Sequence, residues 1–139
     1  FTGGLLHDIG MLALAVGMNK RYALALRHAE RSGRPLAEVE TSFLGTSHVA
    51  VGAYLASVWG LPGVVVDSIE LHHDADATDV EHADVVNAVR LAQRAAECIE
   101  TGDHRFEEAG LSEAQIDLID AEFALTEIMP KHREPLLAI

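Results

Sequence analysis

The stretch that decides the fold is residues 5–15, Leu-Leu-His-Asp-Ile-Gly-Met-Leu-Ala-Leu-Ala. Apolar residues fill this stretch, apart from the imidazole of His7 and the carboxylate of Asp8 at adjacent positions. Burying two such polar groups in an apolar segment is costly unless each finds a partner. A divalent cation is one suitable partner, because a neutral imidazole and a carboxylate are both good metal ligands. The stretch therefore predicts an apolar helix that carries a polar site.

The rest of the chain has the pattern of short helices joined by turns. Glycine and proline mark most of the boundaries, and Thr46 or Ser47 can cap one helix. Val64-Val65-Val66 is the one β-branched run, but the helical periodicity that continues through Ile69 outweighs it. We predict an all-α fold with helices at about Thr2–Ala15, Asn19–Arg31, Pro35–Phe43, Ser47–Trp59, Pro62–His73, Glu81–Glu100 and Glu113–Met129.

Length and composition limit the class of protein. A chain of 139 residues, of which 49% are hydrophobic, suits one globular domain with a real core. The net charge of -12 repels a phosphate backbone, so we expect no nucleic-acid partner. No apolar run is long enough for a membrane span and no signal peptide is present, so we expect no membrane partner and a cytoplasmic location.

Three further histidines lie at one end of an apolar helical face. His48 starts a stripe of residues that recur at helical spacing, and His72 and His73 end two neighbouring stripes that share Ile69. Together with His7, they come from three different predicted helices, and we expect them to converge on Asp8. Each histidine taken alone is more simply a hydrogen-bonded core residue. The other four are interpreted as surface residues: His28, His82, His104 and His132.

Several motifs in order resemble a known family. Residues 4–10, Gly-Leu-Leu-His-Asp-Ile-Gly, look like the signature of the HD superfamily of metal-dependent phosphohydrolases. Glu40, the segment 43–53, Trp-Gly-Leu-Pro at 59–62 and Ile-Glu-Leu-His-His at 69–73 then closely resemble the HDOD domain, the HD-related output domain of bacterial signalling proteins. The resemblance covers about residues 3–92. It implies an HD-type (phosphodiesterase-like) helical bundle, with residues 1–139 forming one HDOD-like domain that lacks the N-terminal helical part of the module.

The resemblance also implies a set of metal ligands. In active relatives the His-Asp pair and later histidines hold one or two divalent cations, which polarise a phosphate ester and supply a metal-bound hydroxide as nucleophile. Glu40 matches a family glutamate that supports the ligands or adds to them. Mn, Fe, Zn, Ni and Mg are the candidate metals. Carried over, the implied ligands are His7, Asp8, His48, His72 and His73.

Departures from the active pattern change the functional expectation. Met11 stands where active cyclic-dinucleotide phosphodiesterases of the HD-GYP type usually have lysine, and their Gly-Tyr-Pro element is missing after the paired histidines. At the position of a later aspartate ligand the chain has Leu91-Ala92-Gln93, and the neutral Gln93 amide is a poor substitute for a carboxylate. We therefore expect one weakly held metal or none.

Three functions follow from these observations. The first is a non-catalytic regulatory module in signal transduction, whose partner is a signalling protein, a fused domain or a small phosphorylated ligand. The second is a metal-dependent phosphohydrolase acting on a phosphodiester or nucleotide, with Lys20, Arg21 and Arg27 as the nearest basic residues in sequence. The third is a structural helical domain whose histidines form a polar network in the core.

Overall fold

The computed structural model describes residues 1–74, 80–101 and 113, and the side chains of all of these except 98–101. The chain divides into two compact units, Phe1–Ala92 and Gln93–Ile139. Every regular element in the described part is a helix, which confirms the predicted all-α class. The elements are α1 (Thr2–Leu6), α2 (Ile9–Ser32), α3 (Leu36–Leu44), α4 (His48–Val58), α5 (Gly63–Glu70) and α6 (Ala83–Thr101).

The first predicted helix was wrong in one respect: it is broken at His7 and Asp8. α1 ends at Leu6 and α2 begins at Ile9, while Asp8 has the non-helical backbone angles φ -101° and ψ 14°. The ring Nδ1–H of His7 donates to the carbonyl oxygen of Gly4 at 2.7 Å, which competes with continued helical hydrogen bonding. The break separates the two polar residues from the apolar helices on either side.

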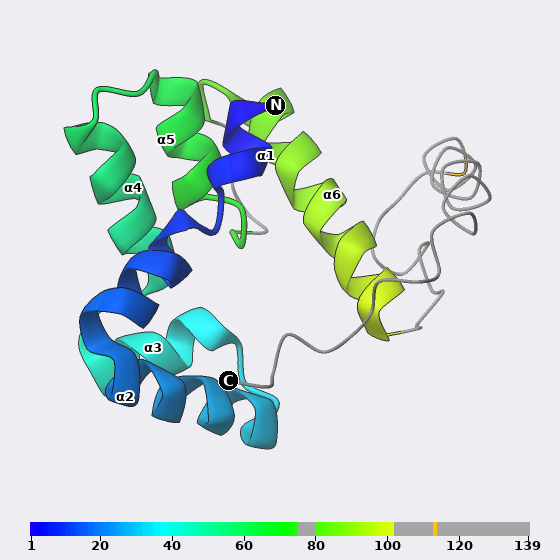
Figure 1. Cartoon of the computed structure of the whole chain (residues 1–139). Coiled ribbons are helices and arrows are strands. Elements are labelled where there is room, and N and C mark those ends of the chain that lie inside the picture. Colours follow the sequence, from blue (N-terminus) through cyan, green and yellow to red (C-terminus); the bar gives the residue numbers. More distant parts are fainter. Residues whose placement is uncertain (75–79, 102–112, 114–139) are drawn as a thin grey trace, which may run out of the picture. The chain divides into compact units, whose positions relative to one another are not determined.

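The predicted boundary near Gly17 is a kink rather than a helix end. α2 continues through it to Ser32, and only Met18 leaves the helical region, with φ -124° and ψ 17°. The part of α2 before the kink packs on α4, and α3 packs along α2 (Figure 1).

Capping residues fix the start of α4 and the end of α3. The side-chain oxygen of Ser47 accepts from the backbone N–H of Ala50 at 3.2 Å, as expected for an N-cap. Gly45 ends α3 at φ 80°, a left-handed conformation that glycine adopts without steric cost. These two caps turn the chain between α3 and α4 within three residues, so Glu40 and His48 face each other across a short connection.

The predicted helix at Pro62–His73 ends early. α5 stops at Glu70 and Leu71 forms its cap, so His72 and His73 lie in the turn that follows. α5 packs against α4 on one side and α1 on the other (Figure 1). Its buried residues Val65 and Ile69 form one core cluster with Ala53 and Ala56 of α4.

The remaining predicted helices have different outcomes. α6 matches the predicted helix at Glu81–Glu100 within two residues. The predicted helix at Glu113–Met129 lies outside the described residues, apart from Glu113 itself, as do His104 and His132. No helix in the described part is both long enough and apolar enough to cross a membrane.

His82 is not the free surface residue that the sequence predicted. Its Nδ1–H donates to Oδ2 of Asp67 at 2.6 Å, which links the start of α6 to α5. This hydrogen bond, together with nearby acidic groups, raises the pKa of His82 above its usual 6.5.

This pair should make stability depend on pH in a defined direction. A raised folded-state pKa means that the pair stabilises the fold below about pH 6.5 and that this contribution is lost as the pH rises through the folded pKa. We expect the unfolding temperature of the wild type to exceed that of Asp67→Asn at acidic pH, and the difference to shrink in alkaline buffer. Parallel melts of the two proteins across this range test it, and a difference that is constant with pH would contradict the pairing.

Candidate metal centre

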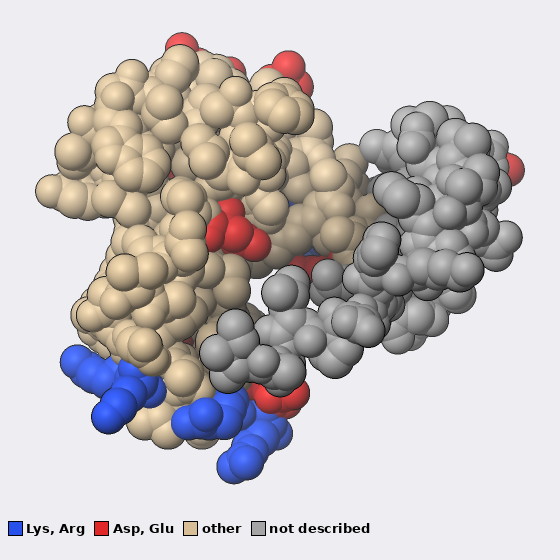
Figure 2. All heavy atoms as spheres, viewed as in Figure 1, with Lys and Arg blue, Asp and Glu red and all other residues tan. Residues whose placement is uncertain are grey.

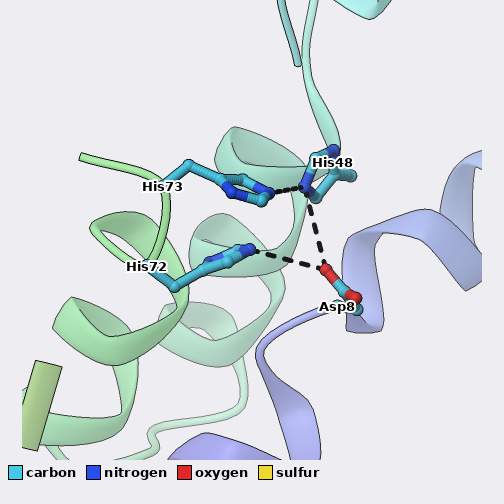
Figure 3. Close-up of side chains that lie close together, drawn as sticks. All are labelled: Asp8, His48, His72 and His73. Atoms are coloured by element: carbon cyan, nitrogen blue, oxygen red, sulfur yellow. Dashed lines mark hydrogen bonds and ion pairs between the residues drawn. The ribbon is translucent and has the colours of Figure 1, made fainter. Parts of the chain in front are cut away.

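Four side chains from three parts of the first unit meet at one point. They are Asp8 from the break between α1 and α2, His48 from the first residue of α4, and His72 and His73 from the turn after α5 (Figure 3). One ligand atom from each lies within 4.8 Å of all the others. Three of the four predicted histidines therefore share this point with Asp8, and the fourth, His7, lies beside the Asp8 carboxylate but outside the set.

A close crossing of two helices brings Asp8 to His48. Gly10 of α2 lies directly against the backbone of α4, where an added Cβ would overlap the carbonyl oxygen of His48 and lie 2.8 Å from the amide nitrogen of Gly52. An added Cβ on Gly52 would in turn lie 3.2 Å from the amide nitrogen of Gly10. The paired glycines let the backbones touch, and Asp8 reaches His48 only because they do.

Glu40 holds His48 in place. Oε2 of this buried carboxylate accepts from the backbone N–H of His48 at 2.7 Å and from its ring Nδ1–H at 2.6 Å. With Nδ1 bonded to Glu40, Nε2 is the ring atom that faces the cluster and can bind a cation. A carboxylate behind a metal-ligating histidine fixes the tautomer and raises the basicity of the ring.

His72 is oriented in the same way by a backbone group. Its Nδ1–H donates to the carbonyl oxygen of Ile69 at 2.7 Å, so Nε2 is the ring atom left to bind a cation. This Nε2 lies 3.5 Å from Oδ1 of Asp8, and both atoms are buried without a hydrogen-bond partner. Two buried acceptors that face each other at this distance repel unless a cation or a proton lies between them.

His73 completes the set from the outer side. Its Nε2 lies 3.1 Å from Nε2 of His48, and the residue is exposed although its ring is partly desolvated against its neighbours. Desolvation, followed by the nearby His72 and His48 rings, lowers the pKa of His73 to about 4. His73 is therefore neutral at pH 7.

The geometry of the cluster is compatible with a bound cation. Burial alone would raise the pKa of Asp8, but the His72 ring at 3.5 Å and the neighbouring His7 and His48 rings lower it overall, which favours the ionised carboxylate. A proton on His73 can satisfy His48 but leaves Asp8 and His72 facing each other. Two atoms bound to one metal at about 2.1 Å and at roughly 90–180° are about 3.0–4.2 Å apart. Three of the separations in the cluster, 3.1, 3.5 and 3.8 Å, fall in this range.

Two predicted site residues lie outside this set. His7 Nε2 lies 3.3 Å from Oδ2 of Asp8, and its ring packs edge-on against His72 with centroids 5.1 Å apart. Its role as a ligand stays a prediction, because His7 is not among the residues whose ligand atoms all lie within 4.8 Å of one another. Gln93 belongs to the second unit and donates to Glu97 at 3.0 Å, so its predicted role also stays a prediction.

Sequence reasoning missed Tyr22, which is buried in α2 beside Glu40. The hydroxyl of Tyr22 and Oε1 of Glu40 are both buried without a hydrogen-bond partner of good geometry. Burial, and then the negative charge of Glu40, raise the pKa of Tyr22. Tyrosine on an apolar helical face normally indicates core packing, so nothing in the pattern pointed to it.

An open groove of about 600 Å³ runs past the outer side of His73. Three hydroxyl residues of α3 and the following turn line it, together with Glu38, Glu70 and Asp74. Arg34 is the one Lys or Arg residue in the lining, and it forms an ion pair with Glu38 at 3.4 Å. The groove is therefore net negative, which does not favour an anionic phosphate ester.

Glu40→Gln should weaken metal binding. We expect about a 10- to 100-fold loss of affinity for Zn²⁺ or Co²⁺, because the amide removes the charge that supports His48 and leaves a buried NH₂ group to satisfy. Glu38→Gln is the matched control, since it lies on the same helix but is exposed and pairs with Arg34. Equal affinities of the two variants, measured by competition with a chromophoric chelator, would contradict the role of Glu40.

The chain is an all-helical protein with a cluster of one carboxylate and three imidazoles that could hold a metal ion. Residues 1–75 match the family model of the HDOD domain, which is more than half of the chain. The chain therefore belongs to the HDOD family.

A solved structure agrees with this fold. The crystal structure at 1.90 Å of an HDOD domain protein of unknown function from Geobacter sulfurreducens superimposes with a TM-score of 0.67 at 24% sequence identity. The alignment covers 91% of this chain and 49% of that chain, so this chain spans about half the length of that protein. No curated protein matches the chain significantly.

Proposed function

We propose that this protein is a regulatory HDOD module that binds one divalent cation in its HD pocket and does not turn over phosphate esters. Cation binding is supported by one observation above all. Asp8 Oδ1 and His72 Nε2 are buried, unpartnered and 3.5 Å apart, with His48 Nε2 beside them at 3.8 Å from the same oxygen. Asp8, His48, His72 and His73 would hold the ion.

The donor set favours particular metals. Three imidazole nitrogens and one carboxylate oxygen suit Zn, Fe, Ni or Mn better than Mg, which prefers oxygen ligands. The bound cation would neutralise the charge of Asp8 and tie the turn after α5 to the break between α1 and α2. In this proposal the module acts in the cytoplasm, and its partner is a signalling protein or a fused signalling domain.

The absence of turnover is supported by the charge around the pocket. The groove beside His73 carries three carboxylates and one arginine that is already paired. Lys20 and Arg27, which the sequence offered for phosphate recognition, are exposed and do not line this groove, and Arg21 donates instead to the carbonyl oxygen of Phe43 at 2.8 Å. A phosphate ester would meet negative charge at the groove.

One feature favours phosphohydrolase activity as a second candidate. A cation held by three or four protein ligands, with Glu40 behind His48, matches the type of site that activates water. In that case the cation would supply Lewis-acid chemistry, while Glu40 and Ile69 would keep His48 and His72 in their ligating tautomers.

Two measurements separate these functions. Elemental analysis of protein purified without chelators should find about one equivalent of a transition metal, and its absence after reconstitution would exclude both functions. Incubation of the loaded protein with bis(p-nitrophenyl) phosphate and with nucleotides should give no turnover. Turnover that disappears in His7→Ala would replace the regulatory module with the hydrolase.

A further inference from the structure

The second half of α2 carries an unusual concentration of positive charge for a chain with a net charge of -12. Half of the ten Lys and Arg residues fall within the fifteen residues 20–34, where Glu30 is the one acidic residue. All five are exposed. Figure 2 shows them gathered at the end of the first unit formed by α2 and α3. They are Lys20, Arg21, Arg27, Arg31 and Arg34.

Three of these cations form a straight row along the helix. At 3.6 residues per turn, Lys20, Arg27 and Arg31 project within about 60° of one another, and Leu24 falls in the same arc. The row lies on the side of α2 opposite the buried residues Tyr22 and Ala25. We call these four residues, Lys20, Leu24, Arg27 and Arg31, the basic stripe.

Within the described residues, the side chains of Lys20, Arg27 and Arg31 make no hydrogen bond or ion pair. Arg31 lies in the last turn of α2, where the helix dipole favours a cation, but this does not account for the other two. Arg27 and Arg31 are four residues apart, a like-charge spacing that is unfavourable in a helix.

We infer that the basic stripe is a docking surface for the acidic face of an amphipathic helix in a partner protein. The stripe is about 16 Å long, the rise along a helix over the eleven steps from Lys20 to Arg31. Acidic side chains at i, i+4 and i+11 of an antiparallel helix would lie opposite Arg31, Arg27 and Lys20. None of the four residues of the basic stripe belongs to the candidate metal centre.

The exposure of Leu24 favours an acidic protein over other polyanions as the partner of the basic stripe. Its side chain is 53% exposed in the middle of the stripe, where it offers an apolar contact with ionic contacts on each side. A phosphate backbone has no apolar group to place there, and the net charge of -12 further disfavours nucleic acid. A membrane-surface helix needs a broad apolar face, whereas the stripe has one leucine.

The test uses the full chain and a defined probe. The probe is a fluorescein-labelled helical peptide with Glu at i, i+4 and i+11 and Leu at i+7, and a scrambled peptide of the same composition is its control. Binding is followed by anisotropy at low salt, about one third of physiological ionic strength. The protein variants are Lys20→Gln/Arg27→Gln/Arg31→Gln and the matched control Arg34→Gln/Arg90→Gln/Arg94→Gln, which removes the same charge from positions outside the basic stripe.

The basic stripe predicts a specific pattern of affinities. The stripe variant should bind the patterned peptide at least about tenfold more weakly than the wild type, and the matched control should stay within about twofold. Circular dichroism checks that both variants keep the wild-type helix content. Equal losses in the two variants, or equal affinity for the scrambled peptide, would overturn the inference.

Three further measurements test the other occupants. Tighter binding of duplex DNA or of phosphatidylserine vesicles than of the patterned peptide would overturn the protein partner. Sedimentation showing wild-type self-association that the stripe variant abolishes would assign the stripe to a second copy of this chain instead. The inference is supported if the patterned peptide binds more tightly than DNA or vesicles and the protein does not self-associate through the stripe.

Discussion

Gly10→Ala should be the most destabilising single-methyl change in the first unit. The new Cβ would overlap the His48 carbonyl and crowd the Gly52 amide, and neither contact involves a flexible side chain that can move aside. Overpacking of this kind costs about 3 kcal/mol or more, which corresponds to a fall of roughly 10 °C in the unfolding temperature. Metal affinity should fall with it, because the same displacement moves His48 away from Asp8.

Gly17→Ala provides the matched control on the same helix. No atom lies within 4 Å of a Cβ added at Gly17, so replacing a helical glycine there should be neutral or stabilising by up to about 1 kcal/mol. Differential scanning calorimetry of the two variants gives the comparison. A Gly10→Ala protein as stable as Gly17→Ala would show that the α2–α4 crossing is looser than described.

Asp8→Asn should have the largest effect on metal binding. The amide keeps the size of the side chain but removes the only carboxylate of the cluster, and we expect the affinity for Zn²⁺ or Co²⁺ to fall more than about 100-fold. The d–d absorption of bound Co²⁺ would report the change in the ligand set as well as the loss of affinity.

Asp67→Asn controls for the removal of a negative charge from the first unit. Asp67 is bonded to His82 and has no contact with the cluster, so its loss should leave metal affinity within about twofold. If Asp8→Asn binds metal as tightly as Asp67→Asn does, Asp8 is not a ligand.

The sequence predicted the helices well where capping residues were present. Gly45 marks the end of α3 and Ser47 marks the start of α4, and the structure has both boundaries. It failed at His7 and Asp8, because the surrounding residues are apolar helix formers and the break depends on a side-chain hydrogen bond to Gly4. Helical propensity alone contains no signal for such competition.

The sequence predicted which residues form the candidate site, but not how they are arranged in space. Spacing placed His48 and the His72–His73 pair on inward faces, and the structure brings them to Asp8. The pattern could not show that α5 ends before the pair, which turns His72 inward and leaves His73 exposed. Nor could it show that Tyr22, fourteen residues from Asp8, lies behind Glu40, because that proximity arises from the packing of α2 on α3.

The crossing of α2 over α4 has a consequence for how this protein can change. Gly10 is two residues from Asp8, and the atom it touches belongs to His48 itself. The same few backbone atoms therefore set both the thermal stability of the bundle and the spacing of its donor atoms. Substitutions that adjust one property will shift the other, so adaptation of this domain to a new temperature must proceed through positions away from the crossing.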